Sequence, residues 1–120
     1  MTKEYITWNK IEKAIDVIDE KIPKELKNQV RGIYGIPRGG LIPAVMLSHR
    51  LKIPIFEEPR VRPIFIVDDI ADTGKTLKSF RNLEDVYIIT LFYHIQSITI
   101  PDFWAFEKQR GWQVYPWESK

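Results

Sequence analysis

The sequence contains no cysteine, which excludes a disulfide framework, a thiol nucleophile and a thiolate metal site together. It also lacks a strong charge of one sign, because 18 lysine and arginine residues stand against 16 acidic residues, for a net charge of +2. A charge balance this even is a poor basis for binding a polyanion. We therefore expect no nucleic-acid partner.

Long apolar runs are missing as well. Residues 1–10 have no apolar core of the kind that a secretory signal carries, and no later run approaches the length that crosses a membrane. We expect a protein that is not exported, has no membrane partner and works in the cytoplasm.

The length and composition indicate a single domain over residues 1–120. No Gly/Ser-rich or low-complexity tract divides the 120 residues, and the hydrophobic share of 44% is enough for a core. A domain of this size is small for an enzyme, so we expect a homo-oligomer, either a dimer or a tetramer.

Helical and extended patterns alternate along the chain. The expected elements are a helix over residues 7–22, a strand over 30–36, a helix over 41–51, a short strand over 53–56, a loop over 57–63, a strand over 64–67, a helix beginning within 72–76 and running through 80, a strand over 86–92, a helix over 102–109 and an extended piece over 112–115. Such alternation predicts an α/β fold, a Rossmann-like parallel sheet flanked by helices.

The most informative segment is residues 64–76, a buried strand that leads into acids, hydroxyls and a glycine turn. Gly74 allows backbone angles that expose successive N–H groups, so residues 71–76 can cradle a phosphate, with hydroxyl donors from Thr73 and Thr76. Asp68 and Asp69 are suited to ribose hydroxyls and magnesium, or one of them caps nearby backbone N–H groups. A nucleoside-triphosphate loop would need glycine at position 69.

Residues 67–76, Val-Asp-Asp-Ile-Ala-Asp-Thr-Gly-Lys-Thr, resemble the phosphoribosyl pyrophosphate (PRPP) signature of type I phosphoribosyltransferases. The resemblance implies that this segment binds PRPP and that Asp69 holds Mg²⁺. Asp72 is then the candidate general base, and its alternative role is to cap the following helix. The implied PRPP-binding residues are Asp68, Asp69, Ala71, Asp72, Thr73, Gly74, Lys75 and Thr76.

A second segment, residues 34–44, looks like the pyrophosphate loop of the same family, with Arg38, Gly39 and Gly40 at its centre. An arginine beside bare backbone is suited to a pyrophosphate leaving group. In relatives the peptide bond before this arginine is often cis. The two ends of the chain resemble the bacterial xanthine-guanine enzymes, which implies that Trp112 covers the purine and that the backbone of Gln113 meets its edge.

The chain departs from the family at two places. After the strand over 86–92, relatives place a lysine that donates to the purine's exocyclic oxygen, and His94 is the nearest match here. Residues 53–61 replace most of a long hairpin and hood that closes over substrate in relatives. The predicted function is transfer of phosphoribose from PRPP to an oxo-purine (guanine, xanthine or hypoxanthine). The alternative is a regulatory protein that binds PRPP or nucleotides and is catalytically weak.

Overall fold

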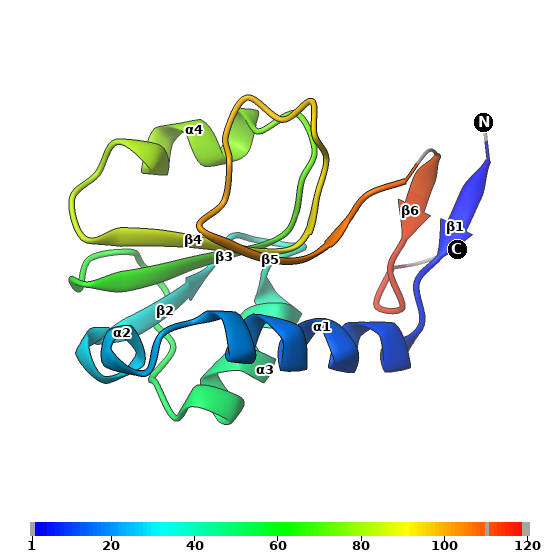
Figure 1. Ribbon diagram of the computed structural model, residues 1–120. Coiled ribbons are helices and arrows are strands. Elements are labelled where there is room, and N and C mark those ends of the chain that lie inside the picture. The colour runs from blue at the N-terminus through cyan, green and yellow to red at the C-terminus, as the bar shows by residue number, and fades with distance from the viewer. Residues whose placement is uncertain (1, 110, 119–120) are drawn as a thin grey trace.

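The computed structural model describes residues 2–109 and 111–118. Its centre is a four-stranded sheet in the order β2-β3-β4-β5, in which every neighbouring pair is parallel. The strands are β2 (Gly32–Gly35), β3 (Ile64–Ala71), β4 (Val86–Tyr93) and β5 (Phe103–Glu107). Helices α1 (Trp8–Lys21) and α3 (Leu41–Leu51) lie on one side of the sheet and α4 (Lys75–Arg81) on the other (Figure 1). The predicted α/β sheet is confirmed.

The central strand β3 is apolar on both faces. Phe65 and Val67 belong to the core cluster that includes α1 and α3, whereas Ile64 and Ile66 belong to the cluster that includes Leu77 of α4. Because successive side chains of a strand point to opposite faces, a continuous apolar run is what a strand covered on both faces requires. The strand continues through Ala71, so its last residues carry the acidic signature to the sheet edge.

Helices α1 and α3 lie where the sequence predicts, with α1 one residue shorter at each end. Thr7 caps α1, and its hydroxyl accepts a hydrogen bond from the N–H of Lys10 at 3.1 Å. Helix α3 spans the predicted residues, with buried Pro43 in its first turn, where the missing N–H has no helical partner to lose. Lys52 ends it in a left-handed conformation.

The structure contradicts the helix expected over residues 102–109, where β5 lies instead. Three of the five residues of β5 are aromatic, and aromatic side chains favour strands over helices. Asp102 precedes the strand, and its carboxylate accepts a hydrogen bond from the N–H of Ile88 at 2.7 Å. This contact fixes the start of β5 beside β4.

Two further elements have no counterpart among the sequence predictions. Helix α2 (Lys24–Gln29) has no periodic apolar signal, since none of its six described residues is buried. Strand β1 (Lys3–Tyr5) pairs in parallel with β6 (Trp112–Val114), so the two ends of the described chain lie side by side (Figure 1). The short strand expected over 53–56 is reduced to one bridge between Ile33 and Ile55.

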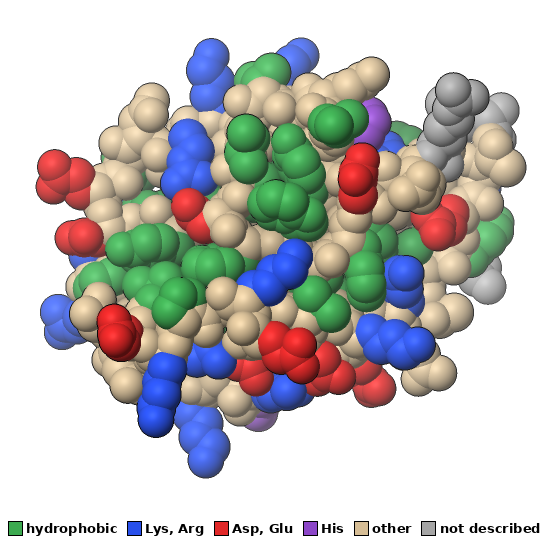
Figure 2. Space-filling model, viewed as in Figure 1, with side chains coloured by type: hydrophobic (Ala, Val, Ile, Leu, Met, Phe, Trp, Pro, Cys, Tyr) green, Lys and Arg blue, Asp and Glu red, His purple; other side chains and the backbone are tan. Residues whose placement is uncertain are grey.

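Charges of both signs are mixed on the surface. Figure 2 shows lysine and arginine side chains interspersed with acidic and hydrophobic ones over one face of the molecule. Among the described residues, no helix combines the length and the hydrophobicity that crossing a membrane requires.

Candidate functional site

Three neighbouring strands deliver polar side chains to one edge of the sheet. The residues that follow β3, β4 and β5 are Asp72, His94 and Lys108. The strands are parallel, so these positions meet at the carboxyl edge, where ligands bind in open α/β sheets. The backbone continues the ladder, because the N–H of His94 donates to Ala71 at 2.9 Å and the N–H of Lys108 donates to Tyr93 at 2.8 Å.

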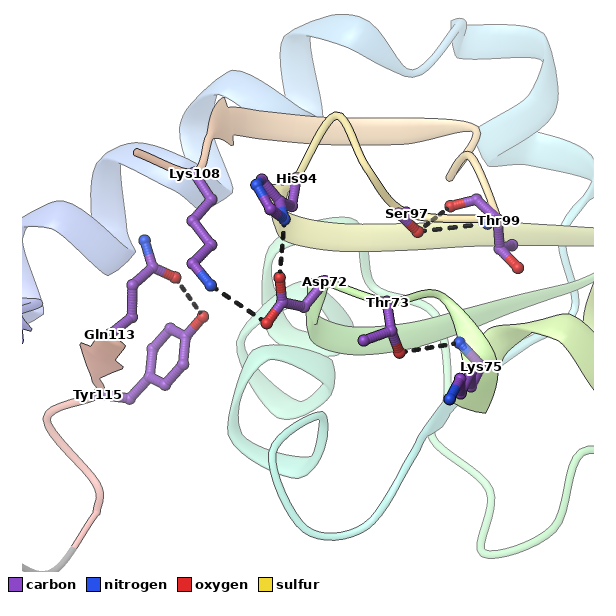
Figure 3. Close-up of polar contacts among 9 residues, drawn as sticks. All are labelled: Asp72, Thr73, Lys75, His94, Ser97, Thr99, Lys108, Gln113 and Tyr115. Carbon is purple, nitrogen blue, oxygen red and sulfur yellow. Dashed lines mark hydrogen bonds and ion pairs between the residues drawn. The ribbon is translucent and has the colours of Figure 1, made fainter. Parts of the chain in front are cut away.

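The carboxylate of Asp72 lies between two cationic or potentially cationic groups (Figure 3). One oxygen is 3.0 Å from Nδ1 of His94, and the other is 3.1 Å from Nζ of Lys108. The side chain that accepts from the N–H of Lys75, at the start of α4, is Thr73, at 3.3 Å. The contacts of Asp72 therefore join strand ends, and do not correspond to the helix-capping alternative.

Asp68 and Asp69 are adjacent, half-buried carboxylates on β3. Oδ1 of Asp68 accepts from the N–H of Asp69 at 2.9 Å, and Oδ1 of Asp69 accepts from the N–H of Ile70 at 2.8 Å. Burial, with the charge of Asp69 adding to it, raises the pKa of Asp68 to about 8. Burial also raises the pKa of Asp69, against the opposing effect of its hydrogen bonds. Two desolvated carboxylates side by side favour a cation or a hydrogen-bond donor between them.

The two signature segments meet at Asp69. A Cβ added to Gly39 would lie 2.6 Å from Cγ of Asp69, so the loop approaches the carboxylate as closely as glycine permits. The Pro37–Arg38 peptide bond is cis. A cavity of about 540 Å³ opens here, and we call it the loop cavity. Its lining residues are Arg38, Gly39, Asp69, Trp117 and Glu118.

A second cavity follows the 71–76 turn, and we call it the cradle cavity. It measures about 210 Å³. Its lining residues are Asp68, Asp69, Ile70, Asp72, Thr73, Gly74, Thr76 and Leu77. Most of the residues that the sequence assigns to PRPP are therefore brought together, whereas buried Ala71 and exposed Lys75 lie outside this lining.

A third cavity, the aromatic cavity, measures about 180 Å³. Its lining residues are Asp69, Ile70, Asp72, Lys108, Trp112, Gln113, Tyr115 and Glu118. Trp112 is 56% exposed and lines this cavity, so part of its side chain is open to a ligand. Within the described part of the chain, Lys108 is the one cation in this lining, and His94 is not part of it.

The backbone of Gln113 faces away from β1. The N–H of Trp112 donates to Thr2 and the carbonyl of Val114 accepts from Ile6, both at 2.8 Å, so these two residues bond to the β1 side. In a parallel pair the residue between them directs its N–H and C=O to the opposite edge. The Gln113 side chain is occupied elsewhere, because its Oε1 accepts from the hydroxyl of Tyr115 at 2.9 Å. Within residues 2–109 and 111–118, no hydrogen bond occupies its backbone N–H or C=O, so the backbone can bond to a ligand in the aromatic cavity.

Sequence reasoning missed Lys108, Tyr115 and Glu118 as lining residues. Lys108 lies at a strand end only because residues 103–107 form a strand. The helix expected over 102–109 placed Lys108 within a helix and gave no reason to assign it to the site. The Lys108 side chain is only 12% exposed. Lysine side chains are rarely buried to this degree unless they are paired, and Lys108 is paired with Asp72. Among the described residues, no group of three or more acidic or histidine side chains converges in a way that could hold a metal ion.

Several known proteins with similar sequences and structures are phosphoribosyltransferases. No family model matches the sequence. The xanthine-guanine phosphoribosyltransferase of Nitratidesulfovibrio vulgaris is 25% identical over 139 residues, covering 96% of this chain and 84% of that protein. A xanthine-guanine-hypoxanthine phosphoribosyltransferase of Helicobacter pylori has the same fold, with a TM-score of 0.76 at 14% identity, over 98% of this chain and 94% of that one.

The crystal structure of a purine phosphoribosyltransferase from Pyrococcus horikoshii aligns with a TM-score of 0.82 and 31% identity. That alignment covers 100% of this chain and 97% of the other. The likeness in sequence and structure thus extends over nearly the whole of both chains and includes the strand ends that carry Asp72 and Lys108. This protein belongs to the type I phosphoribosyltransferase family.

Proposed function

We propose that this protein is a purine phosphoribosyltransferase that transfers the 5-phosphoribosyl group of PRPP to an oxo-purine. The observation that carries the proposal is the meeting of the two signature segments at Asp69, beside a third cavity that has an exposed indole and a cation. One edge of the sheet thereby offers adjacent places for a phosphate, a leaving pyrophosphate and a planar base. Residues 1–120 would act as one domain, since β1 and β6 from its two ends pair.

The cradle cavity is the proposed site of the 5′-phosphate. Thr73 and Thr76 supply hydroxyl donors, and Gly74, at φ +83°, lets the backbone turn so that successive N–H groups are presented together. Exposed Lys75 adds positive charge at the mouth of the turn. Asp68 and Asp69 lie next to this cavity, where ribose hydroxyls can donate to their oxygens.

The residues present fit a magnesium ion that is shared with the substrate. Mg²⁺ commonly takes one or two carboxylates and completes its shell with water and phosphate oxygens. The protein offers such a pair in Asp68 and Asp69, and Asp69 faces the loop cavity as well. Mg²⁺ held there would neutralise charge on the pyrophosphate. Arg38 and the open backbone at Gly39 and Gly40 would bind the pyrophosphate oxygens.

In the proposed reaction, a purine ring nitrogen forms a bond to carbon 1 of the ribose. The bond from that carbon to the pyrophosphate oxygen breaks, and its electron pair leaves with pyrophosphate. The proton that the purine loses passes to Asp72, which lies between the cradle cavity and the aromatic cavity. His94 orients the Asp72 carboxylate through the 3.0 Å contact.

The aromatic cavity is the proposed site of the base. The indole of Trp112 provides a stacking surface, and the free N–H and C=O of Gln113 can bond to the base edge. Lys108 supplies a charged donor in this cavity, the role for which the sequence suggested His94. A charged donor favours a purine with a carbonyl at that edge over adenine, which presents an amino group there.

No observation on the described residues favours the regulatory alternative, since the acids of the signature are in place at the cavities. A cytoplasmic location and a dimer or tetramer remain predictions of the sequence.

The test is product formation from PRPP and Mg²⁺ with guanine, xanthine, hypoxanthine and adenine in turn. We expect monophosphate from an oxo-purine, and a fall of at least about 100-fold in kcat for Asp72→Asn. Asp85→Asn is the matched control, because Asp85 is exposed and has the positive φ that asparagine tolerates. Binding of PRPP without product from any base would overturn the catalytic proposal in favour of the regulatory one.

A further inference from the structure

The segment between β4 and β5 has an apolar outer side and a polar inner side. Ile95 and Ile98 are 70% and 63% exposed, whereas Ser97 and Thr99 are 8% and 2% exposed. Buried hydroxyls in an otherwise exposed loop are costly unless they are hydrogen-bonded. The partners of these hydroxyls therefore indicate what the segment does.

The inner side of the segment is bonded to the cradle turn. The Thr99 hydroxyl donates to the carbonyl of Gly74 at 2.8 Å, and the N–H of Ile98 donates to the carbonyl of Thr73 at 2.8 Å. The Ser97 hydroxyl in turn donates to the Thr99 carbonyl at 2.6 Å and accepts from the Thr99 N–H at 3.3 Å (Figure 3). Ser97 thus holds Thr99, and Thr99 holds the turn.

These bonds fix the direction of two N–H groups. The cis peptide bonds in the described chain precede Arg38 and Pro63, so the peptide bonds around Gly74 are trans. In a planar trans peptide the N–H points opposite to the C=O. Since the carbonyls of Thr73 and Gly74 point to the 97–99 segment, the N–H groups of Gly74 and Lys75 point away from it. The N–H of Lys75 donates to the Thr73 hydroxyl on that side at 3.3 Å, a long contact that a phosphate oxygen would replace.

The packing is close enough to require glycine at position 74. A Cβ there would lie 2.5 Å from Oγ of Ser97 and 2.5 Å from the nitrogen of Thr99. The φ of +83° alone would favour glycine, and the contact with the 97–99 segment excludes any side chain independently. The turn and the segment therefore form one unit.

We propose that Thr99, held by Ser97, is a positioning residue that aims the N–H groups of Gly74 and Lys75 at the 5′-phosphate of PRPP. This role rests on the proposed function, because it takes the cradle cavity as the phosphate site. Thr99 acts through the peptide groups that it orients and does not touch the substrate. Because the donors are already in position, phosphate binding does not have to order the turn, and less conformational entropy is lost on binding.

The test measures binding of ribose 5-phosphate by calorimetry to the wild type, Thr99→Val and Thr99→Ser. Thr99→Val keeps the shape and removes the donor, and we expect the Kd to rise about three- to tenfold. The rise is limited because the N–H of Lys78 also donates to the Gly74 carbonyl, at 3.1 Å. Thr99→Ser retains the hydroxyl and should stay within about twofold of the wild type. In kinetics, Thr99→Val should raise the KM for PRPP and leave the KM for the purine unchanged.

Ser48→Ala is the matched control. Its hydroxyl also donates to a backbone carbonyl, that of Ile53, at 2.6 Å, but near the far end of α3. It should lower stability without changing the Kd. If Thr99→Val binds ribose 5-phosphate as the wild type does, the positioning role is wrong.

If that variant does not fold, amide NMR of the wild type decides, since the Gly74 and Lys75 signals must shift when ribose 5-phosphate is added. Unshifted signals overturn the role of Thr99, whereas a wild type that binds no ribose 5-phosphate overturns the proposed function as well.

Discussion

Replacing Asp68 with asparagine should make the folded protein more stable at mildly alkaline pH when magnesium is absent. Burial and the neighbouring Asp69 raise the pKa of Asp68 from 3.8 to about 8. The folded state thus keeps a proton on Asp68 that the unfolded chain releases above about pH 4. Raising the pH from there to about 8 favours unfolding, so the wild type loses stability over that window.

The size of the effect follows from the shift. Each pH unit between the two pKa values is worth about 1.4 kcal/mol, which sets an upper limit of about 4 kcal/mol between about pH 5 and about pH 8. Asp68 is half-buried and shares its environment with Asp69, so screening by solvent reduces the effect, and we expect about 2 kcal/mol. Asparagine does not titrate. The advantage of Asp68→Asn over the wild type should therefore grow by about 2 kcal/mol across this window.

The assay is urea unfolding in magnesium-free buffer at the two pH values. Asp85→Asn serves as the control for the same chemical change, since Asp85 is exposed and precedes β4, apart from the Asp68–Asp69 pair. If Asp68→Asn and the wild type lose the same free energy of unfolding between the two pH values, Asp68 is not desolvated in the way that the structure indicates. The inference that the pair favours a cation would then fail too.

Two further predictions concern the loop and the aromatic cavity. Gly39→Ala places a methyl group against the Asp69 carboxylate, so we expect the KM for PRPP to rise at least about tenfold, and an unchanged KM would contradict the close approach. Tyr115→Phe leaves the buried Oε1 of Gln113 without the hydroxyl that donates to it at 2.9 Å, so thermal unfolding should show a loss of about 1 to 2 kcal/mol. A loss within experimental error would mean that water replaces the hydroxyl.

The sequence predicts those elements whose local signals agree with their packing. Helix α3 has its predicted bounds because an apolar face, a first-turn proline and a following loop coincide. The mid-chain strands were predictable because they are covered on both faces and are continuously apolar. Strand β5 was harder to predict, because as the edge strand of the four-stranded sheet its residues are half-buried and alternate weakly. Its three aromatic residues favour a strand, but the pairing with β4 that establishes the strand is not contained in the local sequence.

The site residues also fall into those that local sequence predicts and those that only the folded topology brings together. The 71–76 turn and the Arg38 loop are each a continuous segment of the sequence, so the roles proposed for them can be predicted from local spacing alone. Lys108 and Thr99 act on the turn from positions that are distant in sequence, and the topology alone brings them there. His94 was placed correctly at the end of β4, but its contact with Asp72 could not be foreseen, because it depends on how the ends of β3 and β4 align.

In the proposed reaction, the contacts of Asp72 would connect base selection with proton transfer. Both of its oxygens already have a partner, so a purine proton that passes to Asp72 competes with one of these contacts. An oxo-purine in the aromatic cavity offers the Lys108 ammonium a carbonyl as a second acceptor. If the ammonium donated to that carbonyl and no longer to Asp72, the Asp72 oxygen would be free to take the purine proton. Adenine offers no such acceptor and would leave Lys108 on Asp72. The lower activity with adenine should then appear in kcat as well as in KM, because an Asp72 oxygen that is still bonded to Lys108 accepts the purine proton less readily.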